Sequence, residues 1–168
     1  EWGRDLNEDS IILQLSYGEF DAIFAGDAGF HAEERLAGRV GNVEVLKAGH
    51  HGSATATGMR WLGELQPEAA VLSFGANSYG HPAPETVARL AAEDVRVWTT
   101  RRSLVTVTTD GHSFTVSGDS GTIHFRTDPG ASARSGPHDG ATSGRIQFED
   151  DDRAVHREAG AAVPGSDG

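Results

Sequence analysis

Two adjacent histidines, His50 and His51, stand where an apolar, strand-like segment runs into a glycine and a serine. Neutral imidazole is the commonest nitrogen ligand of zinc and related metals. In extended backbone, neighbouring side chains point in opposite directions, so one imidazole can face a site while the other packs behind it. A solvated loop is the alternative role for such a pair. The pair alone therefore leaves a metal site and an ordinary loop both open.

A second apolar run, residues 20–25, is followed by Gly26 and Asp27, and then by Ala28 and Gly29. The ends of strands in α/β folds are the usual place for ligands, which makes the Asp27 carboxylate a candidate metal ligand. An aspartate in this position is also typical of an ordinary turn or a helix cap. Taken alone, Asp27 favours the turn or cap.

His81 follows a third apolar run, residues 69–74, and Pro82 fixes the backbone behind it. An imidazole held at the carboxyl end of another strand can reach the same rim as Asp27. Packing against Tyr79 is the alternative role. His31 is interpreted as a surface residue, and four further histidines carry no assignment: His112, His124, His138 and His156.

The composition restricts the chemistry. The 168 residues carry a formal net charge of −11, from 25 acidic and 14 basic residues, and Lys47 is the single lysine. Adaptation to high salt and a GC-rich codon bias both produce this pattern. A strongly negative chain does not favour non-specific nucleic-acid binding, but metal cations can still attract an anionic substrate. Because there is no cysteine, any metal must bind to His, Asp or Glu.

The elements that must position these residues alternate between strand and helix. Strands are predicted at 10–16, 20–25, 43–46, 69–74, 95–98, 105–108 and 113–116, and helices at 30–36, 58–65 and 84–92. The first two strands form a hairpin, and so do the last two. This order predicts a layered α/β fold. No apolar run reaches about 18 residues, so no membrane span is expected in this chain.

The composition changes after about Gly118. Residues 119–168 are rich in Gly, Ser, Asp and Ala and have few apolar side chains. Such a segment cannot bury enough surface to offset the entropy of ordering. We therefore expect residues 1–118 to be folded and residues 119–168 to be a largely disordered, low-complexity tail. Within the tail, residues 122–126 and 145–148 are candidate edge strands.

Taken in chain order, the motifs resemble those of a known family. They are Asn7-Glu8-Asp9-Ser10, Gly26-Asp27, Glu33-Glu34-Arg35-Leu36, the segment 46–53, the segment 77–82 and the segment 105–111. Over about residues 7–116 this ordered set resembles the C-terminal half of the metallo-β-lactamase-like domain in ComEC-type DNA-uptake proteins, which act in competence. The resemblance implies an αββα sandwich with one or two divalent ions, zinc or manganese, in a hydrolytic centre on its edge.

The resemblance also implies roles for the candidate residues. Asp27 would be a bridging or terminal metal ligand, His50 or His51 a further ligand, and His81 a catalytic candidate. The pattern does not settle which histidine of the pair binds, and the His-x-Gly-Ser/Thr loops of the family favour His50.

One departure from the family pattern is large. The main metal motif, His-x-His-x-Asp-His, occurs nowhere in the 168 residues. Catalytic zinc generally has three protein ligands, so the remaining residues make an incomplete site. The chain is then either a fragment or a truncated, inactive relative, and the missing start methionine favours the fragment. We expect the upstream N-terminal half of the same domain to be its partner, and this chain alone to be inactive.

For the complete domain we expect metal-dependent hydrolysis of a phosphodiester, with DNA as the substrate that the resemblance indicates. A non-catalytic binding or scaffold module is the first alternative, and a metallo-hydrolase of small molecules is the second. The sequence does not fix the compartment; a larger parent protein would place the domain outside the cell or at a membrane.

Overall fold

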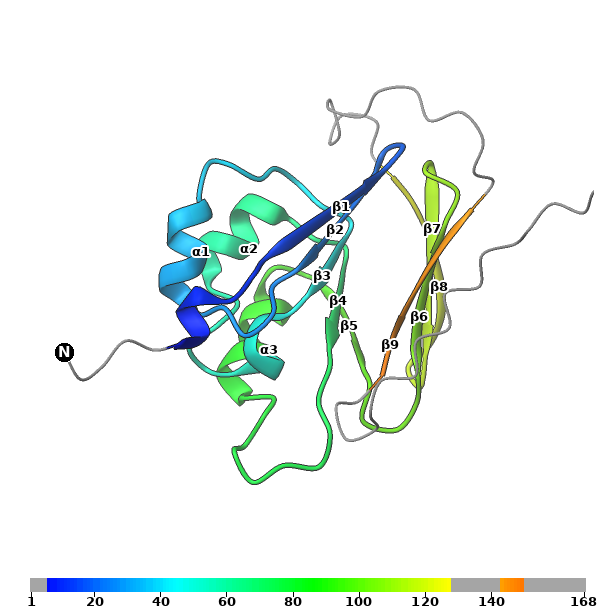
Figure 1. Cartoon of the computed structure of the whole chain (residues 1–168). Helices are drawn as coiled ribbons and strands as arrows, with labels where there is room; N and C mark the ends of the chain where they lie inside the picture. The colour runs from blue at the N-terminus through cyan, green and yellow to red at the C-terminus, as the bar shows by residue number, and fades with distance from the viewer. Residues whose placement is uncertain (1–5, 128–142, 150–168) are drawn as a thin grey trace, which may run out of the picture.

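The computed structural model describes residues 6–127 and 143–149. These residues form three layers (Figure 1): α-helices on one side, a five-stranded sheet in the middle and a four-stranded sheet on the other side. The arrangement confirms the predicted α/β class.

The five-stranded sheet has the strand order β1-β2-β3-β4-β5. Its strands are β1 (Leu13–Tyr17), β2 (Phe20–Phe24), β3 (Val45–Lys47), β4 (Ala69–Leu72) and β5 (Arg96–Thr99). β1 and β2 pair antiparallel as the predicted hairpin, whereas β2 to β5 are parallel. The carboxyl ends of β2, β3 and β4 therefore meet at one edge of the sheet.

Helices provide the crossovers between the parallel strands. They are α1 (Phe30–Leu36), α2 (Met59–Leu65) and α3 (Pro84–Ala92), with short 3-10 turns η1 (Leu6–Asp9) and η2 (Gly49–Gly52). α1 and α3 have the predicted bounds, and Pro84 begins α3 because its fixed φ suits the first helical turn. η2 contains both His50 and His51, so the backbone there is not extended.

The central strands of the middle sheet, β2 to β4, are buried on both faces. Alternate residues such as Leu46 and Leu72 pack against Leu62 and Leu90 of the helices. The intervening residues, such as Val45 and Val71, pack against the second sheet, and this cluster also contains Trp98, Phe114, Val116 and Phe148. Burial on both faces explains why β4 is a continuous apolar run in the sequence.

The second sheet is antiparallel with the order β8-β7-β6-β9. Its strands are β6 (Val105–Thr109), β7 (Ser113–Gly118), β8 (Gly121–Arg126) and β9 (Gly144–Phe148). β8 and β9 are the two candidate strands of the predicted tail, and they lie at opposite edges of the sheet. Ordered structure therefore continues past Gly118. The rest of the predicted tail, 128–142 and 150–168, lies outside the described residues.

The outer face of the second sheet is polar. It carries Thr106, Thr108, Thr115, Ser117, Thr122, His124, Arg145 and Gln147 in register. Within the described ranges no helix covers this face (Figure 1), and its side chains offer a helix no apolar surface. Three layers are thus seen, and the fourth layer of the expected αββα sandwich is not confirmed. In the same ranges, no helix has both the length and the apolar character required to cross a membrane.

Candidate functional site

Asp27 and the three candidate histidines come together at the carboxyl edge of the middle sheet. The Asp27 Oδ1 atom lies 3.3 Å from His51 Nε2. The His50 ring centroid lies 6.3 Å from that of His51 and 5.4 Å from that of His81. Asp27 follows β2, the histidine pair follows β3, and His81 lies in the loop after β4. Three parallel strands thus deliver the four side chains to one rim.

The hydrogen bonds of His51 define its tautomer. Its Nδ1 lies 2.8 Å from the carbonyl oxygen of Ser73, and a carbonyl can only accept a hydrogen bond. Nδ1 therefore carries the proton. In the neutral ring, Nε2 then presents its lone pair toward the Asp27 carboxylate. Two acceptor atoms face each other at this distance, and a bound cation or a proton on Nε2 would bridge them.

The separation of these two atoms suits a tetrahedral ion. Zinc bonds to histidine nitrogen and carboxylate oxygen are about 2.0–2.2 Å long, so two ligands of one tetrahedral ion lie about 3.3–3.5 Å apart. The Asp27–His51 pair therefore fits as two ligands. The described residues contain no group of three His, Cys, Asp or Glu side chains arranged to hold a metal. Asp27 and His51 therefore fit a metal ion as two of its ligands, and the described residues do not supply a complete ligand set.

The backbone of the histidine pair is left-handed, with φ of 44° at His50 and 54° at His51. This conformation costs about 1–3 kcal/mol for each residue other than glycine and is concentrated at functional sites. It also explains why the structure places His51, rather than the favoured His50, against Asp27. In an extended segment, which the sequence pattern predicts here, the two side chains would alternate.

His81 is held by a turn built around Asn77. The Asn77 side chain accepts the His81 N–H at 3.0 Å and donates to the His81 carbonyl at 2.9 Å. Burial lowers the pKa of His81, and repulsion from His50 and His51 lowers it further against the opposing effect of Asp27. The neutral ring is therefore favoured, a form that can either accept or donate a proton.

Sequence reasoning missed two supporting residues. Ser73 orients His51 through its carbonyl oxygen, a backbone role that no residue letter records. Lys47 donates to the Gly26 carbonyl at 3.3 Å, and the same oxygen accepts the His50 N–H at 2.9 Å. These contacts tie the Asp27 turn to the histidine loop. The position of the single lysine directly before that loop was the available signal.

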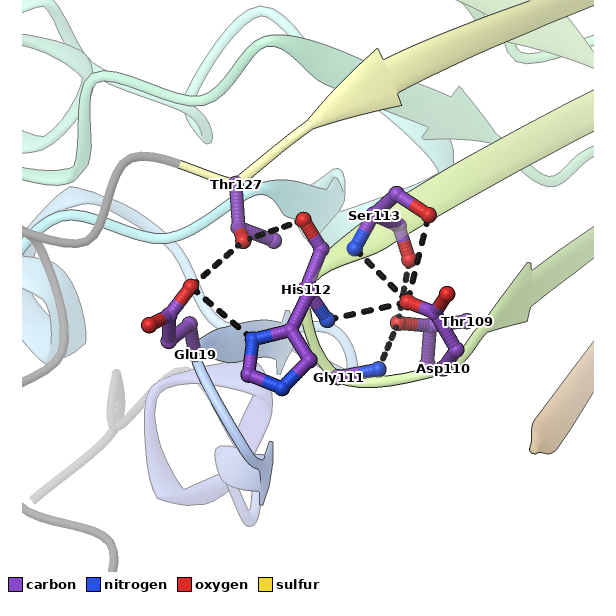
Figure 2. Close-up of polar contacts among 7 residues, drawn as sticks. All are labelled: Glu19, Thr109, Asp110, Gly111, His112, Ser113 and Thr127. Atoms are coloured by element: carbon purple, nitrogen blue, oxygen red, sulfur yellow. Dashed lines mark hydrogen bonds and ion pairs between the residues drawn. The ribbon is translucent and has the colours of Figure 1, made fainter. Parts of the chain in front are cut away.

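A second histidine–carboxylate pair lies at the opposite edge of the middle sheet (Figure 2). His112 Nδ1 lies 3.2 Å from Glu19 Oε2, and the Thr127 hydroxyl donates to the same oxygen at 3.2 Å. The Thr127 hydroxyl also lies 2.8 Å from the His112 carbonyl. This cluster joins the β1–β2 turn to the β6–β7 turn and the end of β8. Its contacts therefore link the two sheets and have a structural role.

Comparison with known proteins supports one part of the predicted resemblance. The chain is 34% identical over 94 residues to ComE operon protein 3 of Bacillus subtilis. These residues are 54% of this chain and 12% of the relative. It is 35% identical over 97 residues to competence protein ComA of Neisseria gonorrhoeae, covering 55% of this chain and 14% of the relative. The chain is similar to competence proteins.

A third relative, recombination protein 2 of Haemophilus influenzae, is 33% identical over 69 residues, which are 41% of this chain and 9% of the relative. The chain thus matches only a small fraction of each of these proteins. No family model matches it. The predicted likeness to competence proteins is confirmed, and the metallo-β-lactamase assignment stays a prediction.

Proposed function

We propose that this chain is a segment of a DNA-uptake protein and contributes Asp27 and His51 to a divalent-metal centre that hydrolyses a phosphodiester. The observation that carries the proposal is the 3.3 Å approach of Asp27 Oδ1 to a His51 nitrogen whose lone pair faces it. The similarity to competence proteins supports DNA as the substrate class.

Each residue at the rim would have a distinct task. Asp27 and His51 would hold the ion, which when bound supplies Lewis acidity and lowers the pKa of a bound water. The Ser73 carbonyl keeps the His51 ring oriented. His81, favoured in its neutral form, would exchange a proton with the substrate at the same rim.

The remaining ligands would come from further chain of the same polypeptide, in the metallo-β-lactamase-like arrangement. The surface of β1 supports this partner. Ile11, Leu13 and Leu15 are 77%, 59% and 39% exposed. Leu13 and Leu15 pair with Phe24 and Ala22, so they lie on the face that the second sheet covers elsewhere.

The outer edge of β1 carries no charged residue between positions 13 and 17. Edge strands of isolated sheets are normally protected by charges, proline or bulges. An unprotected apolar edge fits a strand that further chain covers, and the relatives are long enough to supply such chain.

A non-catalytic binding module is the second candidate. The observation that favours it is the lack of a three-ligand group within residues 6–127 and 143–149. In that case Asp27 and His51 would be a hydrogen-bonded pair with His51 protonated.

Hydrolysis of bis-p-nitrophenyl phosphate with added Mn²⁺ separates the two candidates. We expect little or no turnover by the 168-residue chain, and turnover by the natural polypeptide that includes the sequence upstream of Glu1. Asp27→Ala in the longer protein should abolish turnover. Robust turnover by the short chain that disappears in His51→Ala would contradict the proposed division of the site. Absence of turnover in the longer protein would favour the binding module.

A further inference from the structure

Thr57 is fully buried, and all three of its polar groups have partners. Its N–H donates to Glu33 Oε1 at 2.5 Å, and its carbonyl accepts from Arg89 Nε at 2.9 Å. Its hydroxyl oxygen accepts the N–H of Gly49 at 3.2 Å, so the hydroxyl spans the two ends of the histidine loop, residues 49–58.

A carboxyl group and a guanidinium hold the Thr57 end of this loop from opposite sides. Glu33 of α1 is buried and accepts the Gly58 N–H at 2.9 Å as well as that of Thr57. Arg89 of α3 also donates to the carbonyls of Ala54 and Ala56, at 3.0 and 2.8 Å. Hydrogen bonds from an ionised group such as the Arg89 guanidinium are stronger than those between neutral groups. The N–H side of the segment is thus bound to a buried carboxyl group and the carbonyl side to a cation.

The Gly49 end of the loop connects these hydrogen bonds to the histidines, because Gly49 binds the Thr57 hydroxyl. Gly49 directly precedes His50, and a Cβ at Gly49 would meet the Ala28 carbonyl at 2.5 Å, so the loop is pressed against the Asp27 turn. Thr57 itself has a left-handed φ of 59°. Together with His50 and His51 it makes three strained residues in ten, a conformation that persists only where the surroundings impose it.

We infer that Thr57, gripped by Glu33 and Arg89, is the positioning residue that holds His51 in its orientation toward Asp27. The metal-binding consequence rests on the proposed function, whereas the orientation of His51 does not. Removing the Thr57 hydroxyl frees the Gly49 N–H, loosens the start of the loop and lets the His51 ring leave the Ser73 carbonyl.

The test compares Thr57→Val with the conservative Thr57→Ser in the full 168-residue chain. The matched control is Thr109→Val, because the buried Thr109 hydroxyl accepts the Gly111 N–H at 3.0 Å in the distant β6–β7 turn. Long-range ¹⁵N NMR without metal reports the His51 tautomer, and a Zn²⁺ titration reports metal affinity. Urea unfolding confirms that each variant is folded.

Thr57→Val should lose the Nδ1–H tautomer signature of His51 and bind Zn²⁺ about 10–100-fold more weakly, the usual effect of removing a group that orients a metal ligand. Thr57→Ser and Thr109→Val should keep both. If Thr57→Val does not fold, Glu33→Gln should show the same losses.

An unchanged His51 signature in folded Thr57→Val, or in Glu33→Gln where that variant replaces it, overturns the inference. If the wild-type chain shows no Zn²⁺ binding but the variant still loses the signature, the positioning role is upheld and the proposed metal function fails.

Discussion

The same pair of residue types has different surroundings at the two edges of the middle sheet. At one edge, the Ser73 carbonyl fixes the His51 tautomer and turns the lone pair of Nε2 toward Asp27. At the other edge, Glu19 already accepts the Thr127 hydroxyl, and the exposed His112 contacts it through Nδ1 (Figure 2). Only the first arrangement leaves two acceptor atoms facing each other.

Glu44 gives a prediction for the dependence of stability on pH. It is buried at the amino edge of the sheet, where its carboxylate accepts the Asp21 N–H at 2.5 Å. Burial raises its pKa from 4.5 to about 7, and the charges of Asp21 and Glu68 add to the shift against two backbone hydrogen bonds. The folded state therefore favours the protonated acid, and this contribution to stability is full below about pH 4.5 and lost as the pH rises through 7.

Glu44→Gln should remove most of this loss. The free energy of unfolding of the variant, relative to the wild type, should rise by about 2–3 kcal/mol between pH 4.5 and pH 8.5. Urea unfolding at the two pH values measures it, with Glu93→Gln at the exposed residue that follows α3 as the control. A difference between variant and wild type that does not change with pH would contradict the assignment.

Residue positions at the site were partly predictable from the sequence. Asp27 and His81 each follow an apolar strand, and parallel strands bring such positions to one edge. The choice between His50 and His51 was not predictable, because it depends on a left-handed backbone imposed by Glu33, Arg89 and Thr57 from distant segments.

Among the elements, the contact between η2 and the loop before α3 determines how the histidines are arranged at the carboxyl edge of the middle sheet. The Gly52 carbonyl accepts the Ala83 N–H at 2.8 Å, and the Thr86 hydroxyl donates to the Ser53 carbonyl at 2.6 Å. The start of α3 is thus fastened directly behind His51, which brings the His81 loop to the histidine pair. Gly52 occupies this junction with φ of +81°.

Gly52→Ala should destabilise the chain and disturb the site. A Cβ there would lie 2.9 Å from Pro82 Cβ and 3.0 Å from Leu72 Cδ2, in a backbone conformation that favours glycine. We expect a loss of about 1–3 kcal/mol in the free energy of unfolding.

The matched control is Gly63→Ala in α2, where a Cβ meets nothing within 4 Å. It should gain about 0.5–1 kcal/mol because alanine favours helix. Urea unfolding midpoints compare the two variants. Equal midpoints for Gly52→Ala and the wild type would show that the junction is more tolerant than its geometry indicates.

Element existence was more predictable than element ends. Helical periodicity and Pro84 located α1 and α3, whereas β3 begins two residues later than its apolar run, at Val45. Val43 is buried with the helices, so its side chain carries an apolar signal without pairing in the sheet. Apolar residues in a sequence indicate which side chains are buried. The bounds of a strand depend instead on hydrogen bonds to neighbours that are distant in sequence.

At the scale of the molecule, the layered α/β class followed from the alternation of elements, but the extent of the second sheet did not. β8 lies past the predicted boundary at Gly118, in a segment whose average composition is polar. Its Phe125 stacks on Phe114 with ring centroids 4.6 Å apart and lies 6.2 Å from Trp98. A few aromatic contacts with distant strands hold this segment, and window composition does not record them.

A calorimetric Zn²⁺ titration of the 168-residue chain tests the claim that Asp27 and His51 are two ligands of an incomplete metal site. We expect weak binding to the wild type, weakened at least tenfold in both Asp27→Ala and His51→Ala. His112→Ala, which removes the Glu19–His112 pair, should bind like the wild type. Wild-type binding in the Asp27 and His51 variants, or an equal loss in His112→Ala, would contradict the claim.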